Sequence, residues 1–105
     1  YDREYFYGLY LDRKGGLLQK EIVSIGSLSS TVVHAREIFK TAVKCSAASI
    51  ILVHNHPSGD PTPSKEDIDI TRRLVQSGDI IGIEVIDHLI IGQKNYCSLK
   101  EKGLI

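Results

Sequence analysis

The chain has 105 residues, of which 42% are hydrophobic and 25% charged, as in an ordinary globular protein. This length suits one core, so we predict a single domain over residues 1–105. Thirteen basic side chains balance thirteen acidic ones, so the overall charge does not favour nucleic acid as a partner. No apolar run approaches the about 20 residues that span a bilayer, and two cysteines make no disulfide framework. We therefore expect a cytoplasmic protein without a membrane partner.

The first part of the chain predicts a β-hairpin followed by a helix. Residues 4–11 and 17–25 are strand-like and flank a turn sequence at 12–16. A Ser-rich loop is expected at 26–31. The following residues have the spacing of one apolar helical face, which comprises Ala35, Ile38, Phe39, Ala42 and Val43.

The second part predicts strands around one further helix. Residues 49–54 form a β-branched run typical of a short buried strand, and 64–76 predict a helix for which Gly78 is the terminating residue. The inner face of this helix is expected to carry Ile68, Thr71, Leu74 and Val75. Short strands are predicted after it, at 81–86, 88–91 and 96–99. The order ββαβαβββ predicts an α/β fold with a mixed central β-sheet and flanking helices.

The end of the strand predicted at 49–54 and the loop after it carry side chains of the kinds that bind metals. His54 and His56 should leave the strand on one face, roughly 6–7 Å apart at Cα, because alternate strand residues share a face. Asp67, in the first turn of the next helix, offers a third ligand. Two histidines and one carboxylate leave one position of a tetrahedral Zn²⁺ open, which is typical of a catalytic site. Each part alone also has a structural explanation, since Ser64 and Asp67 fit a helix capping box and histidines are common at strand exits.

The motif His54-x-His56-Pro57, followed by Ser64-x-x-Asp67, resembles the JAMM motif of the JAB/MPN metalloproteases. Over essentially its whole length the sequence is similar to the RadC-type branch of that family. The segments that carry this similarity are 26–28, 36–39, 54–64, 71–74 and 87–92. The resemblance implies a cytidine-deaminase-like JAB/MPN fold and zinc-dependent peptidase or isopeptidase chemistry.

The family motif also includes a catalytic glutamate just before a strand. Glu4 matches that position, whereas Glu21, at the start of the second hairpin strand, is the alternative. Glu37 falls on the first predicted helix, where a surface ion pair with a neighbouring basic side chain would explain it. A general base must reach the attacking water, and this requirement favours Glu4.

These observations predict a Zn²⁺-dependent hydrolase acting on a peptide or isopeptide substrate, with Glu4 as the proton carrier. Ser64 either caps the second helix or donates a hydrogen bond to the oxyanion. Asn55 and Ser58 are candidates for supporting the metal ligands or for shaping the loop, and His88 is either a buried structural residue or a support behind the site. The alternative function is a metal-binding module without turnover, associated with DNA repair or DNA-linked complexes.

Overall fold

The computed structural model describes residues 3–25 and 33–105, so the loop expected at 26–31 lies outside the described residues. The elements in chain order are β1 (Tyr5–Leu11), β2 (Leu17–Ile25), α1 (Ala35–Lys44), β3 (Ser49–Asn55), α2 (Lys65–Ile81), β4 (Glu84–Ile91) and β5 (Tyr96–Ser98). The strands form one sheet in the order β2-β1-β3-β4-β5. The β3–β4 pair is parallel and the other neighbouring pairs are antiparallel. The predicted α/β fold with a mixed central sheet is confirmed.

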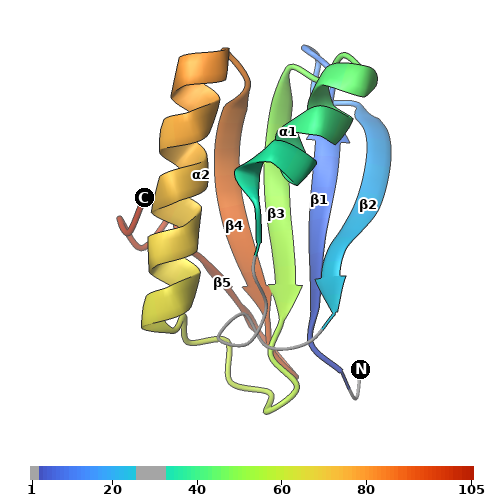
Figure 1. Ribbon diagram of the computed structural model, residues 1–105. Helices are drawn as coiled ribbons and strands as arrows, with labels where there is room; N and C mark the ends of the chain where they lie inside the picture. The colour runs from blue at the N-terminus through green and yellow to red at the C-terminus, as the bar shows by residue number, and fades with distance from the viewer. Residues whose placement is uncertain (1–2, 26–32) are drawn as a thin grey trace.

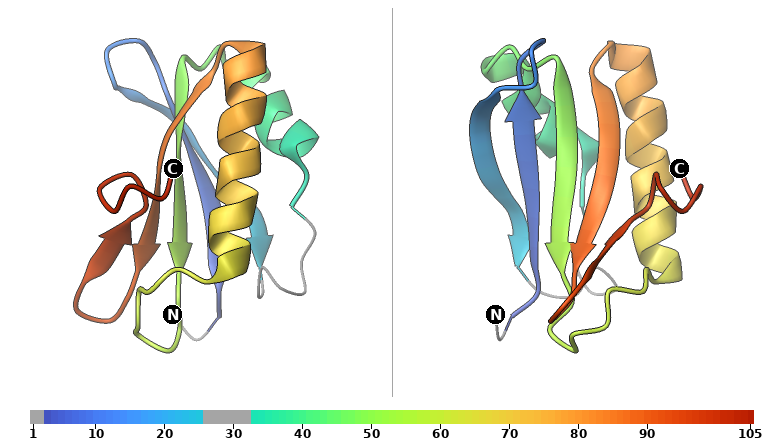
Figure 2. Two further views of the ribbon diagram at one scale, coloured as in Figure 1. Left: turned by 90° about the vertical axis from the view of Figure 1, so that its left-hand side faces the viewer. Right: turned by 180° about the vertical axis from the view of Figure 1, so that it is seen from behind.

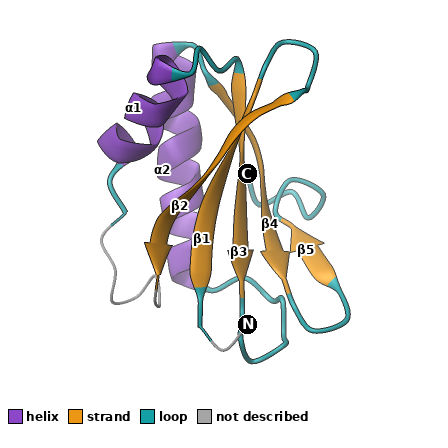
Figure 3. Cartoon of the chain, turned by 90° about the vertical axis from the view of Figure 1, so that its right-hand side faces the viewer, coloured by secondary structure: helices purple, strands orange, loops and turns teal. Residues whose placement is uncertain are grey.

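Both helices pack against the same face of the sheet (Figures 1 and 3). Seen from behind, the strands lie in front of the helices and expose the opposite face of the sheet (Figure 2). The core fills the space between the two layers, and its largest fully buried apolar side chains are Phe6, Tyr10, Ile38, Ile50, Leu52 and Leu74. In the part of the chain that the structure describes, neither helix is long and apolar enough to cross a membrane.

Helix α1 begins at Ala35, as the apolar spacing predicted. Its buried residues are Ile38, Phe39 and Ala42, whereas Val43 is 63% exposed, so its predicted place on the inner face is wrong. Successive helical residues point about 100° apart. A face centred on Ile38 and Ala42 therefore leaves Val43 at its margin, in the last turn.

Helix α2 is one turn longer than predicted. The helix continues through Gly78 to Ile81 and ends at Gly82, whose φ of 88° is left-handed and whose N–H donates to the Gly78 carbonyl. Gly78 is therefore an interior residue, and its predicted role as the terminating residue is wrong. The buried residues of α2 are Asp67, Ile70, Thr71, Leu74 and Gly78, while the predicted Ile68 and Val75 are only partly buried.

Gly78 permits a close approach between α2 and the chain that enters β4. A Cβ atom at this position would lie 2.3 Å from the carbonyl oxygen of Ile83. Replacing an interior helical glycine with alanine usually stabilises a helix by about 1 kcal/mol. Here we expect Gly78→Ala to lower the free energy of unfolding by about 1–3 kcal/mol instead, because the backbone must shift. Urea denaturation would measure this, with Ser77→Ala as the control; a stabilised Gly78→Ala variant would contradict the close approach.

Strand β4 is a single strand, so the prediction of separate strands at 81–86 and 88–91 is wrong. The register with β3 changes from Ile50 opposite Val85 to Ile51 opposite Asp87, which leaves Ile86 as an extra residue. This bulge interrupts the alternation that the sequence pattern relied on, without ending the strand. As a result Val85 and His88 are both buried, although three positions separate them.

Candidate metal centre

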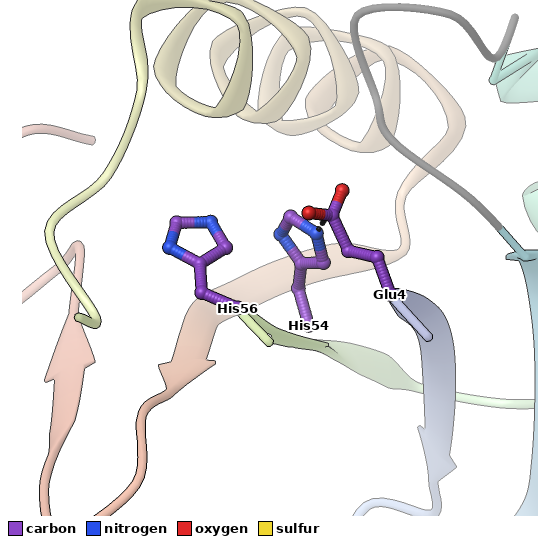
Figure 4. A group of neighbouring side chains, drawn as sticks. All are labelled: Glu4, His54 and His56. Atoms are coloured by element: carbon purple, nitrogen blue, oxygen red, sulfur yellow. Dashed lines mark ion pairs between the residues drawn. The ribbon is translucent and has the colours of Figure 1, made fainter. Parts of the chain in front are cut away.

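The start of β1, the end of β3 and the start of α2 lie at the same end of the sheet (Figure 1), and the predicted site residues belong to these segments or lie directly beside them. In the antiparallel β1–β3 pair, Phe6 lies opposite His54. Side chains on one strand alternate between faces, so Glu4 shares the face of Phe6, and His56 shares the face of His54. Figure 4 shows Glu4, His54 and His56 gathered together, with Glu4 and His54 joined by an ion pair.

Two carboxylates approach the two histidines. One ligand atom from each of Glu4, His54 and His56 lies within 4.8 Å of the others, and Glu4 Oε2 is 3.0 Å from His54 Nε2. Asp67 contacts both rings, with Oδ1 3.3 Å from His54 Nδ1 and Oδ2 3.1 Å from His56 Nε2. The structure therefore brings together Glu4 and the three residues that the sequence predicted as ligands.

The ring of His56 is held in the orientation that metal binding requires. Its Nδ1 lies 2.9 Å from the carbonyl oxygen of Asp60. A carbonyl only accepts hydrogen bonds, so Nδ1 carries a proton, and Nε2, which faces Asp67 Oδ2, is the ring nitrogen placed to bind a metal. A metal-binding histidine commonly donates its other N–H to a backbone carbonyl in this way. The loop that supplies this carbonyl turns at Gly59, whose φ of 88° is left-handed.

His54 is 1% exposed, and among the described residues neither of its ring nitrogens has a hydrogen-bond partner of acceptable geometry. Burial acts to lower the pKa of His54, but the neighbouring Asp67 and Glu4 carboxylates raise that pKa overall. Buried polar atoms of this kind are rare, and a metal bond would satisfy one of them. A metal ion binds only one of the two ring nitrogens of His54. The contacts of Asp67 with His54 Nδ1 at 3.3 Å and with His56 Nε2 at 3.1 Å are close to the edge, about 3.3 Å, of a tetrahedron around zinc, whereas Glu4 contacts the other nitrogen of His54. These residues fit a divalent metal.

Asp67 is fixed by the start of α2. Its Oδ2 accepts the Ser64 N–H at 2.8 Å, and its own N–H donates to Ser64 Oγ at 3.0 Å. This is the predicted capping box, so the capping role of Ser64 is confirmed, whereas its role as an oxyanion donor stays a prediction. Burial acts to raise the pKa of Asp67, but the contacts with His54 and Ser64 outweigh it and hold that pKa well below its usual range. Asp67 is thus an oriented, charged carboxylate at neutral pH.

Comparison with models of known protein families identifies the family of this chain. The model of the RadC-like JAB domain matches residues 1–104. The chain belongs to the RadC-like JAB family. Relatives named UPF0758 protein are 70% identical over 105 residues in Syntrophomonas wolfei and 62% identical over 104 in Desulforamulus reducens. UPF0758 protein YsxA of Bacillus subtilis is 60% identical over 103 residues. These matches cover 98–100% of this chain but only 45–46% of each relative, so the chain spans less than half of their length.

The other two glutamates that the sequence offered as bases lie elsewhere in this RadC-like domain. Glu21 and Glu37 line a cavity of about 350 Å³ between β2 and α1. Glu21 accepts a hydrogen bond from Thr41 Oγ1 at 2.9 Å, and Glu37 lies 4.0 Å from Arg36 as a surface ion pair. The contact with His54 belongs to Glu4, which is the arrangement a general base would need.

His88 lies behind the site, is fully buried, and forms a hydrogen bond with Thr71 of α2 in this RadC-like domain. Thr71 Oγ1 lies 2.6 Å from both the Asp67 carbonyl oxygen and His88 Nδ1. The carbonyl can only accept, so the hydroxyl donates to it and accepts from a protonated His88 Nδ1. In the sequence, the only signal for Thr71 was its expected place on the inner face of the helix, which does not indicate a contact with His88.

The buried His88 should make the stability of the metal-free RadC-like domain depend on pH. Burial lowers the pKa of His88 to about 3, from 6.5. Between these values the unfolded chain binds a proton that the folded protein does not, so stability falls as the pH is lowered, by up to about 1.4 kcal/mol per pH unit. His54, whose pKa is raised, contributes a slope of opposite sign, which fades as the pH falls below about 6 because the unfolded chain then binds that proton too.

The range from pH 6 to 4.5 isolates this effect, because Asp67 titrates at lower pH. Urea denaturation across that range should show a smaller slope for His88→Gln than for the natural protein. His34→Gln, at an exposed histidine, should keep the full slope. Equal slopes in all three proteins would contradict a neutral, buried His88.

Proposed function

We propose that this RadC-like domain is a Zn²⁺-dependent hydrolase that cleaves a peptide or isopeptide bond. The observation that carries the proposal is the contact of Glu4 with the buried His54, which Asp67 links to the half-buried His56. In this proposal His54, His56 and Asp67 hold the metal, and Glu4 is left to move protons. Membership of the JAB family, which includes metalloproteases, supports the proposal.

The chemistry follows from the roles of these side chains. Zinc at such a site polarises a carbonyl and activates water for attack on it. Glu4 accepts the proton of the attacking water and delivers it to the leaving amine. Glu4 is suited to both steps because it lies just before β1 and its side chain remains 20% exposed, open to solvent and substrate. The Ser64 hydroxyl, whose oxygen accepts the Asp67 N–H, still has its own proton to donate to a developing oxyanion.

Hydrolysis can be tested without knowing the natural substrate. The zinc-loaded chain would be incubated with peptides from a digested bacterial proteome and with peptides joined through lysine ε-amides. Mass spectrometry would count new amino termini and released lysine side chains. We expect cleavage by the natural protein and none by Glu4→Gln. Zinc-loaded protein that cleaves neither kind of bond would favour a metal-binding module without turnover.

Ser64 can be tested separately because its capping and oxyanion roles need different groups. Ser64→Asp keeps a good N-cap but has no proton to give, whereas Ser64→Thr keeps both. We expect both variants to melt near the natural protein. Ser64→Asp should lose about 10²-fold or more in turnover, while Ser64→Thr should retain activity. Unchanged turnover in Ser64→Asp, with zinc still bound, would leave capping as the sole role of Ser64.

A further inference from the structure

Asn55, between the two histidines, binds the backbone on both sides of Glu4. Its Nδ2 donates to the Arg3 carbonyl at 2.8 Å, and its Oδ1 accepts from the Tyr5 N–H at 2.6 Å. Asn55 is only 8% exposed, and both hydrogen bonds are partly buried. We propose that Asn55 is a positioning residue that holds Glu4 over the metal site, an inference that rests on the proposed function of Glu4.

The position of these bonds explains why a side chain is needed there. The backbone pairing of β1 with β3 ends at Phe6 opposite His54, and β1 itself begins at Tyr5. Glu4 therefore precedes the regular strand and lies beyond the last residue pair of β1 with β3, while Tyr5 still pairs with Ile25 of β2. Asn55 continues the connection for two more residues by using both ends of its amide. The carboxylate of Glu4 is then kept within 3.0 Å of His54 Nε2.

Both ends of the amide matter, and this makes the role specific to asparagine. An aspartate has the same shape and still accepts from the Tyr5 N–H, but it has no donor for the Arg3 carbonyl. An alanine loses both bonds. Loss of either bond should let Glu4 move, and a displacement of about 1 Å in a reacting group costs up to about 10²-fold in rate.

The test uses cobalt(II) in place of zinc, because its visible absorption reports on the groups around the metal. Spectra would be recorded for the natural protein, Asn55→Ala, Asn55→Asp, Glu4→Gln and the double variant Asn55→Ala/Glu4→Gln. Asn95→Ala, at the exposed asparagine of the chain, is the matched control. Circular dichroism would show whether each variant is folded. If Asn55→Ala does not fold, Asn55→Asp takes its place in the comparison.

We expect each Asn55 variant to bind one cobalt ion and to shift the spectrum in the direction of Glu4→Gln. The double variant should match Glu4→Gln alone, since a residue that acts through Glu4 has no further effect once Glu4 is changed. An Asn55→Ala spectrum like that of the natural protein, additive effects in the double variant, or no effect of Glu4→Gln would each overturn the proposal.

Turnover provides a second readout that separates this inference from the proposed function. With a cleaved peptide, Asn55→Ala should lower kcat by about tenfold or more and leave KM unchanged, because Glu4 acts in the chemical step. A raised KM with unchanged kcat would contradict the positioning role. If the natural protein cleaves nothing, the proposed hydrolysis fails, while the cobalt spectra still decide whether Asn55 positions Glu4.

Discussion

His56→Ala and Asp67→Asn should each weaken zinc binding by about 10²-fold or more, because each removes one of three protein ligands. Asp67→Asn is the sharper variant, since an asparagine oxygen can still accept the Ser64 N–H and preserve the capping box. Competition with a chromophoric chelator would measure the affinity, and elemental analysis the zinc content.

The matched control for this experiment is His34→Ala, which removes an exposed histidine that makes no capping hydrogen bond at the start of α1. This variant should bind zinc like the natural protein. One tightly bound zinc ion in both His56→Ala and Asp67→Asn would show that the metal site is elsewhere or uses other ligands.

Glu4→Gln should reduce turnover by about 10²–10⁴-fold and leave zinc content and folding intact. Glutamine has nearly the same shape as glutamate, but its amide cannot accept the proton of the attacking water. Hydrolysis of any peptide cleaved by the natural protein would be measured together with the zinc content of the same samples.

Glu21→Gln is the control, because Glu21 lies in the cavity between β2 and α1 and should leave turnover unchanged. Loss of activity in Glu21→Gln but not in Glu4→Gln would reverse the assignment of the base. Loss of zinc from Glu4→Gln would instead make Glu4 a ligand, a role that its position within 4.8 Å of the two histidine nitrogens also permits.

The parts of the site that sequence reasoning could predict are those close together in the chain. His54 lies near the end of a recognisable buried strand, His56 comes just after it, and Asp67 follows a recognisable N-cap. The alternation of a strand and the start of a helix were therefore enough to bring them together. Glu4 needed the family resemblance as well, since nothing in residues 1–10 alone indicates that β1 pairs with β3.

Other features depend on contacts between distant residues and were not predictable. Gly78 and Gly82 are both glycines that could end a helix, and the approach of Ile83 to Gly78 is visible only after folding. The bulge at Ile86 likewise arises from pairing with β3. The bonds from Asn55 to residues 3 and 5 span about half of the chain and have no local sequence signal.

The location of Glu4 outside the regular part of β1 has a consequence for dynamics. The three proposed ligands all come from residues 54–67, whereas the proposed base comes from a segment that precedes the first strand. Ends of strands open locally at a much lower free-energy cost than global unfolding. If Glu4 is the base, as proposed, fraying of residues 3–5 would stop proton transfer without displacing the proposed metal ligands. The fraction of molecules in which residues 3–5 keep their native contacts would then set the fraction able to transfer protons at any moment. That fraction would not depend on metal occupancy.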